Sequence, residues 1–424
     1  MPPLEKRQPH VLALAEPSLH RRIASDPAGE ADDPIAAYTA AKASRRQRLR
    51  LRRTGKPSAE SPEAVSIAPA AGRPQFASRS PDIVLSTRNP VIVWLANNEL
   101  PLSLGILAVV YLCSWAGFAW PARWLSVQHA AADGRYVRGA HDAKFVALWI
   151  CRIIAARAVM LHHILPAIPR YYGITRPRTL RRFGESTWFL CYITLSWSIG
   201  FHIWRNSPYY MNTRNLYTNY PEDHCLMPYT LKWYYLVQAA FWISNLYTVF
   251  VEERRKDHYE MVTHHCATIA LVLLSYTFHF TRFGHVFMLV MDFPDLFLTS
   301  AKMLRYLGSE MAPNVLFAVF TVSWVATKHY LCLKLMFSIW TQGIVEVPLE
   351  KRYPNHPDSY ASYTIVGGMW ALLCVLQVVL IYWLVLIIKL LKRVLLTGEE
   401  PQDSRSDDEG DEEEEEEAEK PQTA

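Results

Sequence analysis

Long apolar stretches fill the centre of this 424-residue chain, and each is about the length that a helix needs to cross the hydrocarbon core of a bilayer. Inside a bilayer, backbone polar groups must bond within a helix or a closed barrel, and barrel strands are only about half as long. We therefore predict an all-α polytopic membrane protein with about eight transmembrane helices. The expected spans are residues 101–120, 144–166, 185–204, 229–251, 257–281, 283–306, 313–335 and 366–391.

The two ends of the chain differ from this apolar centre. Residues 1–90 are rich in proline, alanine, serine and arginine and include a basic run at 44–53, whereas residues 397–424 contain an acidic run at 411–417. Such segments cannot bury enough apolar surface to offset the entropy of ordering, so we expect both tails to be disordered. The basic run is interpreted as a membrane-surface or topology signal rather than a nucleic-acid site.

Basic residues are unevenly distributed between the loops. They are concentrated after the second and fourth spans, and fewer flank the opposite ends. Since cytosolic loops carry the excess of basic residues, these loops and both termini are predicted to be cytosolic. We expect the first span, rather than a cleaved signal peptide, to direct insertion. The basic residues are Arg170, Arg176, Arg178, Arg181 and Arg182 in one loop and Arg254, Arg255 and Lys256 in the other.

The fifth and sixth spans contain four titratable residues that a membrane helix normally excludes. His264 and His265 are adjacent in the fifth span, and Asp292 and Asp295 lie in the sixth. An ionised side chain at mid-bilayer costs about 2.5–3.5 kcal/mol on insertion scales, so such residues are usually kept for function. At about 1.5 Å rise per residue, His264, Asp295 and Asp292 lie roughly 10, 16 and 21 Å from the cytosolic ends of their helices.

The spacing of these four residues allows them to meet. The connection between the two spans, residues 281–284, is so short that the helices must be antiparallel neighbours. Asp292 and Asp295 share one face of their helix. His264 and His265 point about 100° apart, so only one imidazole can face the aspartates directly.

Paired histidines and aspartates favour acyl transfer. A carboxylate bonded to one imidazole nitrogen raises the basicity of the other, and the ring can then act as a general base or a nucleophile. Transfer of an acyl group from a thioester to an amine needs this function, because the incoming ammonium must lose a proton. The chain has no G-x-S-x-G elbow and no Walker-type loop. A catalytic site is the leading hypothesis, and structural histidines that bond across helices are the plainer alternative.

Metal binding and disulfide bonding are not predicted. The seven cysteines form no C-x-x-C pair, and most lie in apolar stretches, where a thiol packs as a small hydrophobe. The histidines outside the cluster do not form the spaced boxes of di-iron membrane enzymes. We therefore expect no metal at this site.

A stretch of about fifty residues carries a family resemblance. It includes residues 254–265, Ser275-Tyr276, 279–281, Met291-Asp292, Asp295 and Ala301-Lys302, and an upstream span contains residues 234–238 and Trp242. These residues resemble the ceramide synthases, the Lag1/Lac1 group within the TLC-domain membrane proteins, and in particular the fungal members. By this resemblance, residues 178–396 form the TLC catalytic domain with spans three to eight. Residues 91–177 form an N-terminal transmembrane region with spans one and two.

The resemblance implies a reaction and its catalytic residues. A sphingoid base, sphinganine or phytosphingosine, would be N-acylated by fatty acyl-CoA in the endoplasmic reticulum membrane, giving (dihydro)ceramide and CoA. Acyl-CoA is then a co-substrate, and no cofactor is expected. His264, His265, Asp292 and Asp295 would be catalytic, with His264 and Asp295 as the central dyad and His265 supporting orientation or the oxyanion. His264 would either carry the acyl group as an acyl-imidazole or deprotonate the amine, and both routes stay open.

Further residues have two interpretations each. The basic residues at the cytosolic mouth would meet the CoA phosphates or only anchor the topology, and Lys302 presents the same choice. The two polar residues that follow the histidines would line the lipid channel or form interhelical hydrogen bonds. These candidate substrate-binding residues are Arg254, Arg255, Lys256, Ser275, Tyr276 and Lys302.

Regulation and partners are also implied. Ser404 and Ser406 precede acidic residues, which suits an acidophilic kinase, and phosphorylation would add about −1.5 to −2 charge at each site. The resemblance suggests a small single-span accessory subunit and a homodimer or a heterodimer with a paralogue. The last loop, about residues 338–363, resembles the region associated with chain-length choice, but it does not reveal a length.

Two other functions are alternatives to a ceramide synthase. A non-catalytic TLC-domain lipid scaffold or sensor would be expected to lack the paired histidines or aspartates, and both pairs are present. A proton-coupled lipid transporter would be expected to show an internal repeat of spans, and none is found in the sequence.

Overall fold

The computed structural model describes residues 90–397 apart from 175, 253–254, 310 and 348–361. Over these ranges the secondary structure is helical, and extended pairing is limited to isolated bridges between Ala130, Tyr136 and Met227. The all-α prediction is confirmed. The two tails predicted to be disordered, residues 1–90 and 397–424, lie outside the described residues except for the innermost residue of each.

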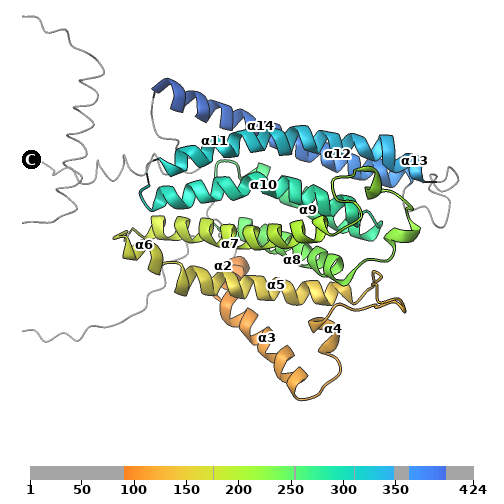
Figure 1. Cartoon of the computed structure of the whole chain (residues 1–424). Helices are drawn as coiled ribbons and strands as arrows, with labels where there is room; N and C mark the ends of the chain where they lie inside the picture. The colour runs from red at the N-terminus through yellow and green to blue at the C-terminus, as the bar shows by residue number, and fades with distance from the viewer. Residues whose placement is uncertain (1–89, 175, 253–254, 310, 348–361, 398–424) are drawn as a thin grey trace, which may run out of the picture. The chain divides into compact units, whose positions relative to one another are not determined.

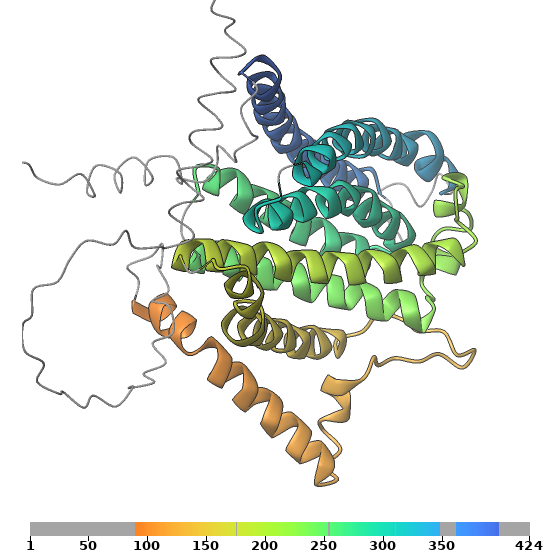
Figure 2. The same cartoon turned by 60° about the vertical axis from the view of Figure 1, so that its left-hand side comes forward.

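The first described helices are joined at a sharp bend. α2 (Pro90–Asn97) and α3 (Glu99–Trp115) meet at 64°. α3 packs against α5 (Asp142–Val159) and slopes away from it toward α4, as Figures 1 and 2 show. The short segments on either side of α5 are α4 (Ala122–Leu125), the π-helical η1 (Met160–Ile164) and α6 (Ala167–Tyr171).

A bundle of longer helices follows, and its members run side by side in Figure 1. They are α7 (Pro177–Arg205), α8 (Tyr229–Val251), α9 (His258–Thr277), α10 (Thr281–Tyr306) and α14 (Tyr363–Thr397). The loop between α7 and α8 contains two 3₁₀ turns, η2 (Arg214–Leu216) and η3 (Glu222–His224). One further rod consists of α11 (Ala312–Trp324), the π-helical η4 (Val325–Leu331), α12 (Cys332–Ser338), the π-helical η5 (Ile339–Gly343) and α13 (Ile344–Glu346).

Each of the eight predicted spans overlaps a helix of the described chain, although 101–120 runs past the end of α3 and 257–281 past the end of α9, and the helices differ in polarity. By length and apolar composition, three helical rods of the described chain could cross a membrane, at Asp142–Tyr171, Ala312–Glu346 and Tyr363–Leu396, and the bent pair α2–α3 would be a fourth. The helices α7 to α10 are long enough to span but are more polar. Polar side chains are tolerated in a membrane helix when they face protein. The number of eight spans therefore stays a prediction.

Helix α10 lies at the centre of the bundle. It contacts α7, α9, α11 and η4, while α9 also contacts α8 and α14. α9 and α10 are joined only by residues 278–280, where His279 adopts a positive φ of 61° to turn the chain. This confirms that the fifth and sixth spans are neighbours. Phe283 and Phe287 of α10 share one buried cluster with Leu335 of α12 and Leu373 of α14.

A buried ion pair ties the segment before α5 to the bundle. The Lys232 ammonium at the start of α8 is fully buried, lies 2.8 Å from Asp142 Oδ1, and donates to the carbonyl oxygens of Gln128 at 2.9 Å and Val137 at 2.6 Å. The other oxygen of Asp142 accepts a hydrogen bond from the Tyr276 hydroxyl of α9 at 2.7 Å. Three helices and one loop are thus held by a single carboxylate and a single ammonium.

Loss of the Asp142 charge should therefore destabilise the fold. In an Asp142→Asn variant the Lys232 ammonium stays buried without its counter-charge, and breaking such a pair costs about 3–5 kcal/mol. We expect a clear fall in the thermal unfolding temperature in detergent. Asp133→Asn is the matched control, because Asp133 pairs with Arg135 on the exposed surface of a nearby loop and should leave stability almost unchanged. Equal effects of the two substitutions would contradict the role of the buried pair.

Candidate active site

A cavity of about 750 Å³, counting its open part, is enclosed by α8, α9, α10, η4 and α14. Most of its wall is made of aliphatic, aromatic and methionine side chains, among them Leu271, Phe287, Met288, Met291 and Leu373. The polar side chains are gathered in two places along its length. The cavity is therefore apolar through most of its length, with distinct chemistry at either end.

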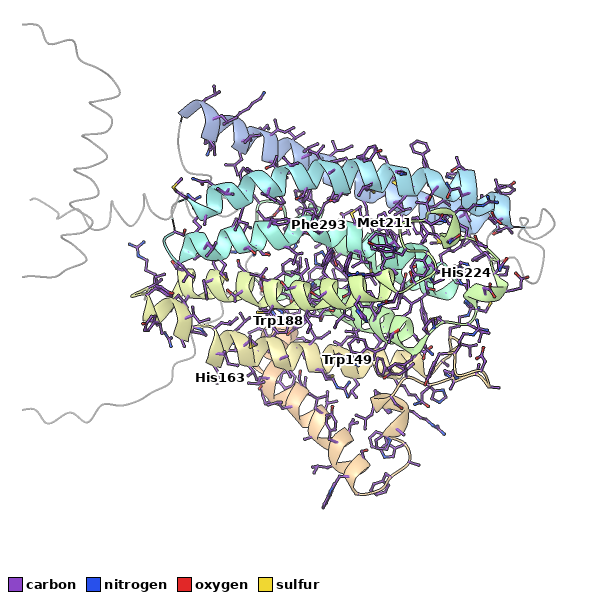
Figure 3. All side chains as sticks on the ribbon, viewed as in Figure 1. Trp149, His163, Trp188, Met211, His224 and Phe293 are labelled. Atoms are coloured by element: carbon purple, nitrogen blue, oxygen red, sulfur yellow. The ribbon has the colours of Figure 1, made fainter. Side chains whose placement is uncertain are left out.

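Four charged or titratable side chains form the polar end of the cavity. They are His264 of α9, Asp292 and Asp295 of α10, and Lys328 of η4. Phe293, between the two aspartates in the chain, marks the middle of α10 in Figure 3, with His163 at one end of the bundle and His224 at the other. The polar end thus lies deep within the bundle. Three of the four predicted catalytic residues line this one cavity.

His264 is held by aromatic rings rather than by hydrogen bonds. Its ring lies edge-on to Trp242 of α8 at 5.8 Å and to Trp383 of α14 at 5.4 Å, measured between ring centres. Trp383 is itself fixed by a hydrogen bond from its Nε1 to Asp257 Oδ2 at 3.1 Å. The Nδ1 atom of His264 is buried and has no hydrogen-bond partner among the described residues. The imidazole is positioned by packing and keeps its hydrogen-bonding capacity for another partner.

His265 does not share the position of His264. It is buried outside the cavity lining, and its Nδ1 is 2.9 Å from the carbonyl oxygen of Met261. Because a carbonyl oxygen only accepts, Nδ1 of His265 must carry the proton. Its ring packs against the same Trp242 at 5.6 Å. Of the two adjacent histidines, only His264 faces the cavity, as their separation around the helix led us to expect.

The Asp295 carboxylate pairs with a lysine and not with an imidazole. Lys328 Nζ donates to Asp295 Oδ1 at 3.0 Å and to Oδ2 at 2.8 Å. The same ammonium lies 4.3 Å from the ring centre of Trp324, a cation–π contact. The expected direct bond between His264 and Asp295 is absent from the hydrogen bonds of the described residues. The reason is electrostatic, since a buried ammonium needs a counter-charge more than a neutral imidazole does.

Lys328 is the residue that sequence reasoning missed. It is one of two lysines, with Lys334, in the seventh predicted span, and a lysine in an apolar stretch is a signal of function or of pairing with another helix. It sits in η4, and π-helical turns of this kind are frequent at functional sites because the extra residue re-aims a side chain. Trp242 and Trp383 were also missed as partners of His264, because no sequence spacing relates the helices that carry them.

The far end of the cavity contains Tyr235 of α8, Ser275 of α9 and Gly284 of α10. Ser275 therefore lines the cavity as predicted. Tyr276 does not, because its hydroxyl turns away to Asp142 and belongs to the buried ion pair. Eleven residues separate His264 from Ser275, which places the two ends roughly 16 Å apart along α9.

The predicted basic substrate-binding residues lie away from the cavity lining. Arg255 Nη2 is 3.5 Å from Glu185 Oε2 of α7, Lys256 is exposed, and Lys302 is half-buried near the end of α10. Arg254 lies outside the described residues, as do the predicted phosphorylation sites Ser404 and Ser406. So does most of the loop at 338–363. Within the described ranges, no three His, Cys, Asp or Glu side chains gather as metal ligands would.

Comparison with known proteins identifies the family. The TLC-domain model matches residues 182–389, close to the predicted domain at 178–396. The sphingosine N-acyltransferase lag1 of Schizosaccharomyces pombe is 32% identical over 325 residues, which are 74% of this chain and 80% of the relative. A sphingosine N-acyltransferase-like protein of Alternaria alternata is 30% identical over 343 residues, covering 74% and 76%. The ceramide synthase LAG1 of Saccharomyces cerevisiae is 30% identical over 274 residues, covering 64% and 65%.

The fold and the match together define a multi-pass TLC-domain membrane protein. The chain belongs to the Lag1/Lac1 family of sphingosine N-acyltransferases, or ceramide synthases, and resembles its fungal members. It is therefore an acyltransferase.

The ion pair at the polar end should show strong energetic coupling. Lys328→Met alone leaves Asp295 without its counter-charge, and Asp295→Asn alone strands the lysine, so each should cost about 3 kcal/mol or more of unfolding free energy. The double variant removes both charges and should cost less than the sum of the two. A double-mutant cycle measured by thermal unfolding in detergent tests this, and additive effects would contradict the pairing.

Proposed function

We propose that this protein is a ceramide synthase that transfers a fatty acyl group from acyl-CoA to the amine of a sphingoid base, sphinganine or phytosphingosine. The products are (dihydro)ceramide and free CoA. The observation that carries the proposal is a cavity-facing His264 with two carboxylates and an ammonium at one end of an otherwise apolar cavity. The related proteins named sphingosine N-acyltransferase and ceramide synthase support the same reaction.

The apolar cavity suits one hydrocarbon chain of the reactants. A thioester carbonyl at the polar end would be within the reach of His264, while its chain lies against the aliphatic and aromatic wall. Removing that chain from water is favourable in proportion to the apolar area buried. Binding energy from the chain can then position the thioester for attack, which is a use of remote contacts common in enzymes.

His264 supplies the proton transfer that the reaction needs. In one route the imidazole removes a proton from the ammonium of the base, and the free amine attacks the thioester carbon. The C–N bond forms, the C–S bond breaks, and the nitrogen loses a second proton as the amide forms. Of the two protons released, one passes to the leaving thiolate and the other to solvent. In the other route the ring nitrogen attacks first, the C–S bond breaks, and CoA leaves, so that the acyl group is held as an acyl-imidazole. The free amine, its first proton lost to solvent, then attacks the acyl carbon, the bond to the imidazole breaks, and the second nitrogen proton is lost as the ring is released. The two routes differ in whether a covalent intermediate forms.

The charged residues have distinct roles in this proposal. Lys328 supplies a positive charge at the carbonyl oxygen, where negative charge develops in either route. Asp295 holds the Lys328 ammonium in place through two hydrogen bonds. Asp292 offers a carboxylate to the ammonium of the sphingoid base. His265 acts indirectly, because it packs on the Trp242 that positions His264.

The surroundings of the reaction complete the proposal. The enzyme would work in the endoplasmic reticulum membrane with both termini in the cytosol, without a cofactor. CoA phosphates would meet the basic residues near the start of α9, where Arg255 and Lys256 lie. A small single-span subunit and a second synthase chain are the proposed protein partners.

The central test is the loss of activity on removing the His264 imidazole. Microsomes from cells without endogenous ceramide synthases, expressing this chain with its partner subunit, are assayed with labelled sphinganine and a panel of acyl-CoA lengths. His264→Ala should reduce the rate by about 10²–10⁴-fold, the usual contribution of a general base. Cys266→Ala is the matched control, because Cys266 lies two positions along the same helix and is exposed.

Two results would argue against the proposal. A folded His264→Ala protein with wild-type activity would remove the imidazole from the mechanism. Absence of ceramide from the wild-type chain with every acyl-CoA length would remove the reaction itself. The two chemical routes are separated by intact-protein mass, since an acyl adduct formed from acyl-CoA without amine, and lost in His264→Ala, indicates the acyl-imidazole.

A further inference from the structure

The far end of the cavity is closed by two hydroxyl groups. The hydroxyls of Tyr235 and Ser275 form a short hydrogen bond between α8 and α9. Ser275 also donates its proton to the Val272 carbonyl oxygen at 3.0 Å, so the Tyr235 hydroxyl must be the donor between the two. Both side chains line the cavity and are almost completely buried, at 1% and 3% exposed.

A glycine on the third helix allows this closure. Gly284 of α10 has no side chain, and a Cβ built there would overlap the Tyr235 hydroxyl and lie 3.1 Å from Ser275 Oγ. The tyrosine can therefore lie across the cavity only because residue 284 is glycine. Phe283 beside it is 4% exposed and stacks on Phe287, with ring centres 5.8 Å apart. Three neighbouring helices thus converge on one point.

The two ends of the cavity differ in access. The Asp295 side chain at the polar end is 23% exposed, whereas Tyr235 and Ser275 at the far end are almost inaccessible. Eleven residues separate Asp295 from Gly284, just as eleven separate His264 from Ser275, so both helices place the ends roughly 16 Å apart. A chain that begins at His264 and extends through the cavity therefore meets the Tyr235–Ser275 pair.

From these contacts we infer that Tyr235, Ser275 and Gly284 form the stop that limits the length of the acyl chain. This rests on the proposed function, because it assumes that the thioester carbon is held at His264. The CoA portion of the thioester is large and charged and must stay outside, so the acyl chain is the part that points inward. A longer chain would have to break the hydrogen bond between the two hydroxyls and leave the buried Tyr235 hydroxyl without its acceptor, which is unfavourable in a low-dielectric interior.

The test compares acyl-CoA length profiles of variants that change only the stop. Tyr235→Phe combined with Ser275→Ala removes both hydroxyl oxygens and lengthens the cavity. We expect its longest efficiently used acyl-CoA to increase by about two carbons, with the ratio of long-chain to short-chain rates rising about ten-fold or more. Tyr229→Phe is the matched control, because Tyr229 lies on the same helix as Tyr235, is exposed and does not line the cavity. Its profile should match that of the wild type.

A second variant refills the space that the first one opens. In Gly284→Ala combined with Tyr235→Phe, the new methyl group takes the place of the lost hydroxyl. The nearest remaining atom of residue 235 is Cζ, 3.1 Å from the new carbon, so the two can fit with a small adjustment. We expect this variant to keep a profile close to that of the wild type, unlike Tyr235→Phe alone.

The end of the bound chain can also be located in the unmodified protein. An acyl-CoA with a diazirine at its terminal carbon is photolysed with the wild-type enzyme, and the labelled peptides are identified. Labels on the α8, α9 or α10 peptides that contain Tyr235, Ser275 or Gly284 are expected. Labels confined to residues near His264, or to the loop at 338–363, would overturn the inference.

The outcomes distinguish this inference from the proposed function. If the variants are active and their preferred acyl-CoA lengths are unchanged, the inferred stop is wrong, and the proposed ceramide synthase activity still stands. The variants could instead change the preferred length of the sphingoid base at a fixed acyl-CoA and leave the preferred acyl length unchanged. That result would show that the cavity holds the hydrocarbon chain of the sphingoid base, and the inferred acyl stop would be wrong. A wild-type protein that forms no ceramide would overturn both.

Discussion

A buried ammonium inside a membrane bundle is the constraint on which the functional site depends. Hydrocarbon offers no compensation for a lone charge, so Lys328 must find a carboxylate within the protein, and it finds Asp295. The pair holds the rod that contains η4 against α10. It also lies on the wall of the cavity. The interaction that stabilises the contact between these helices therefore also places a cation on the cavity wall, at the end where the proposed reaction puts the thioester carbonyl.

The sequence correctly predicted those features of the site that depend only on residue spacing within one helix. The spacing of Asp292 and Asp295 predicted a shared face, and the angle between His264 and His265 predicted that one ring alone would face it. Both expectations describe the structure. The number of eight membrane spans stays a prediction, because α7 to α10 are not among the helices apolar enough to be recognised as spans by composition.

The remaining features depend on contacts between helices far apart in the chain. Lys328 reaches Asp295 across 33 positions, and Tyr276 reaches Asp142 across 134. No periodicity within a segment relates such pairs, so the partner of Asp295 was expected to be an imidazole, and for Tyr276 the lipid channel and an interhelical hydrogen bond both stayed open. The lysine at 328 was the available signal, because a charge within an apolar span needs a partner from another helix.

The buried ion pair between Lys232 and Asp142 has a consequence for how the protein is assembled in the membrane. Asp142 precedes Lys232 by ninety positions, so the segment with the carboxylate is synthesised before the segment with the ammonium. Helix α8 can then enter the bilayer with its lysine neutralised on arrival, by the acid and by the carbonyls of Gln128 and Val137. The counter-charge of Lys232 thus lies in a segment that is synthesised before α8, so this ammonium does not depend on a later segment for its partner.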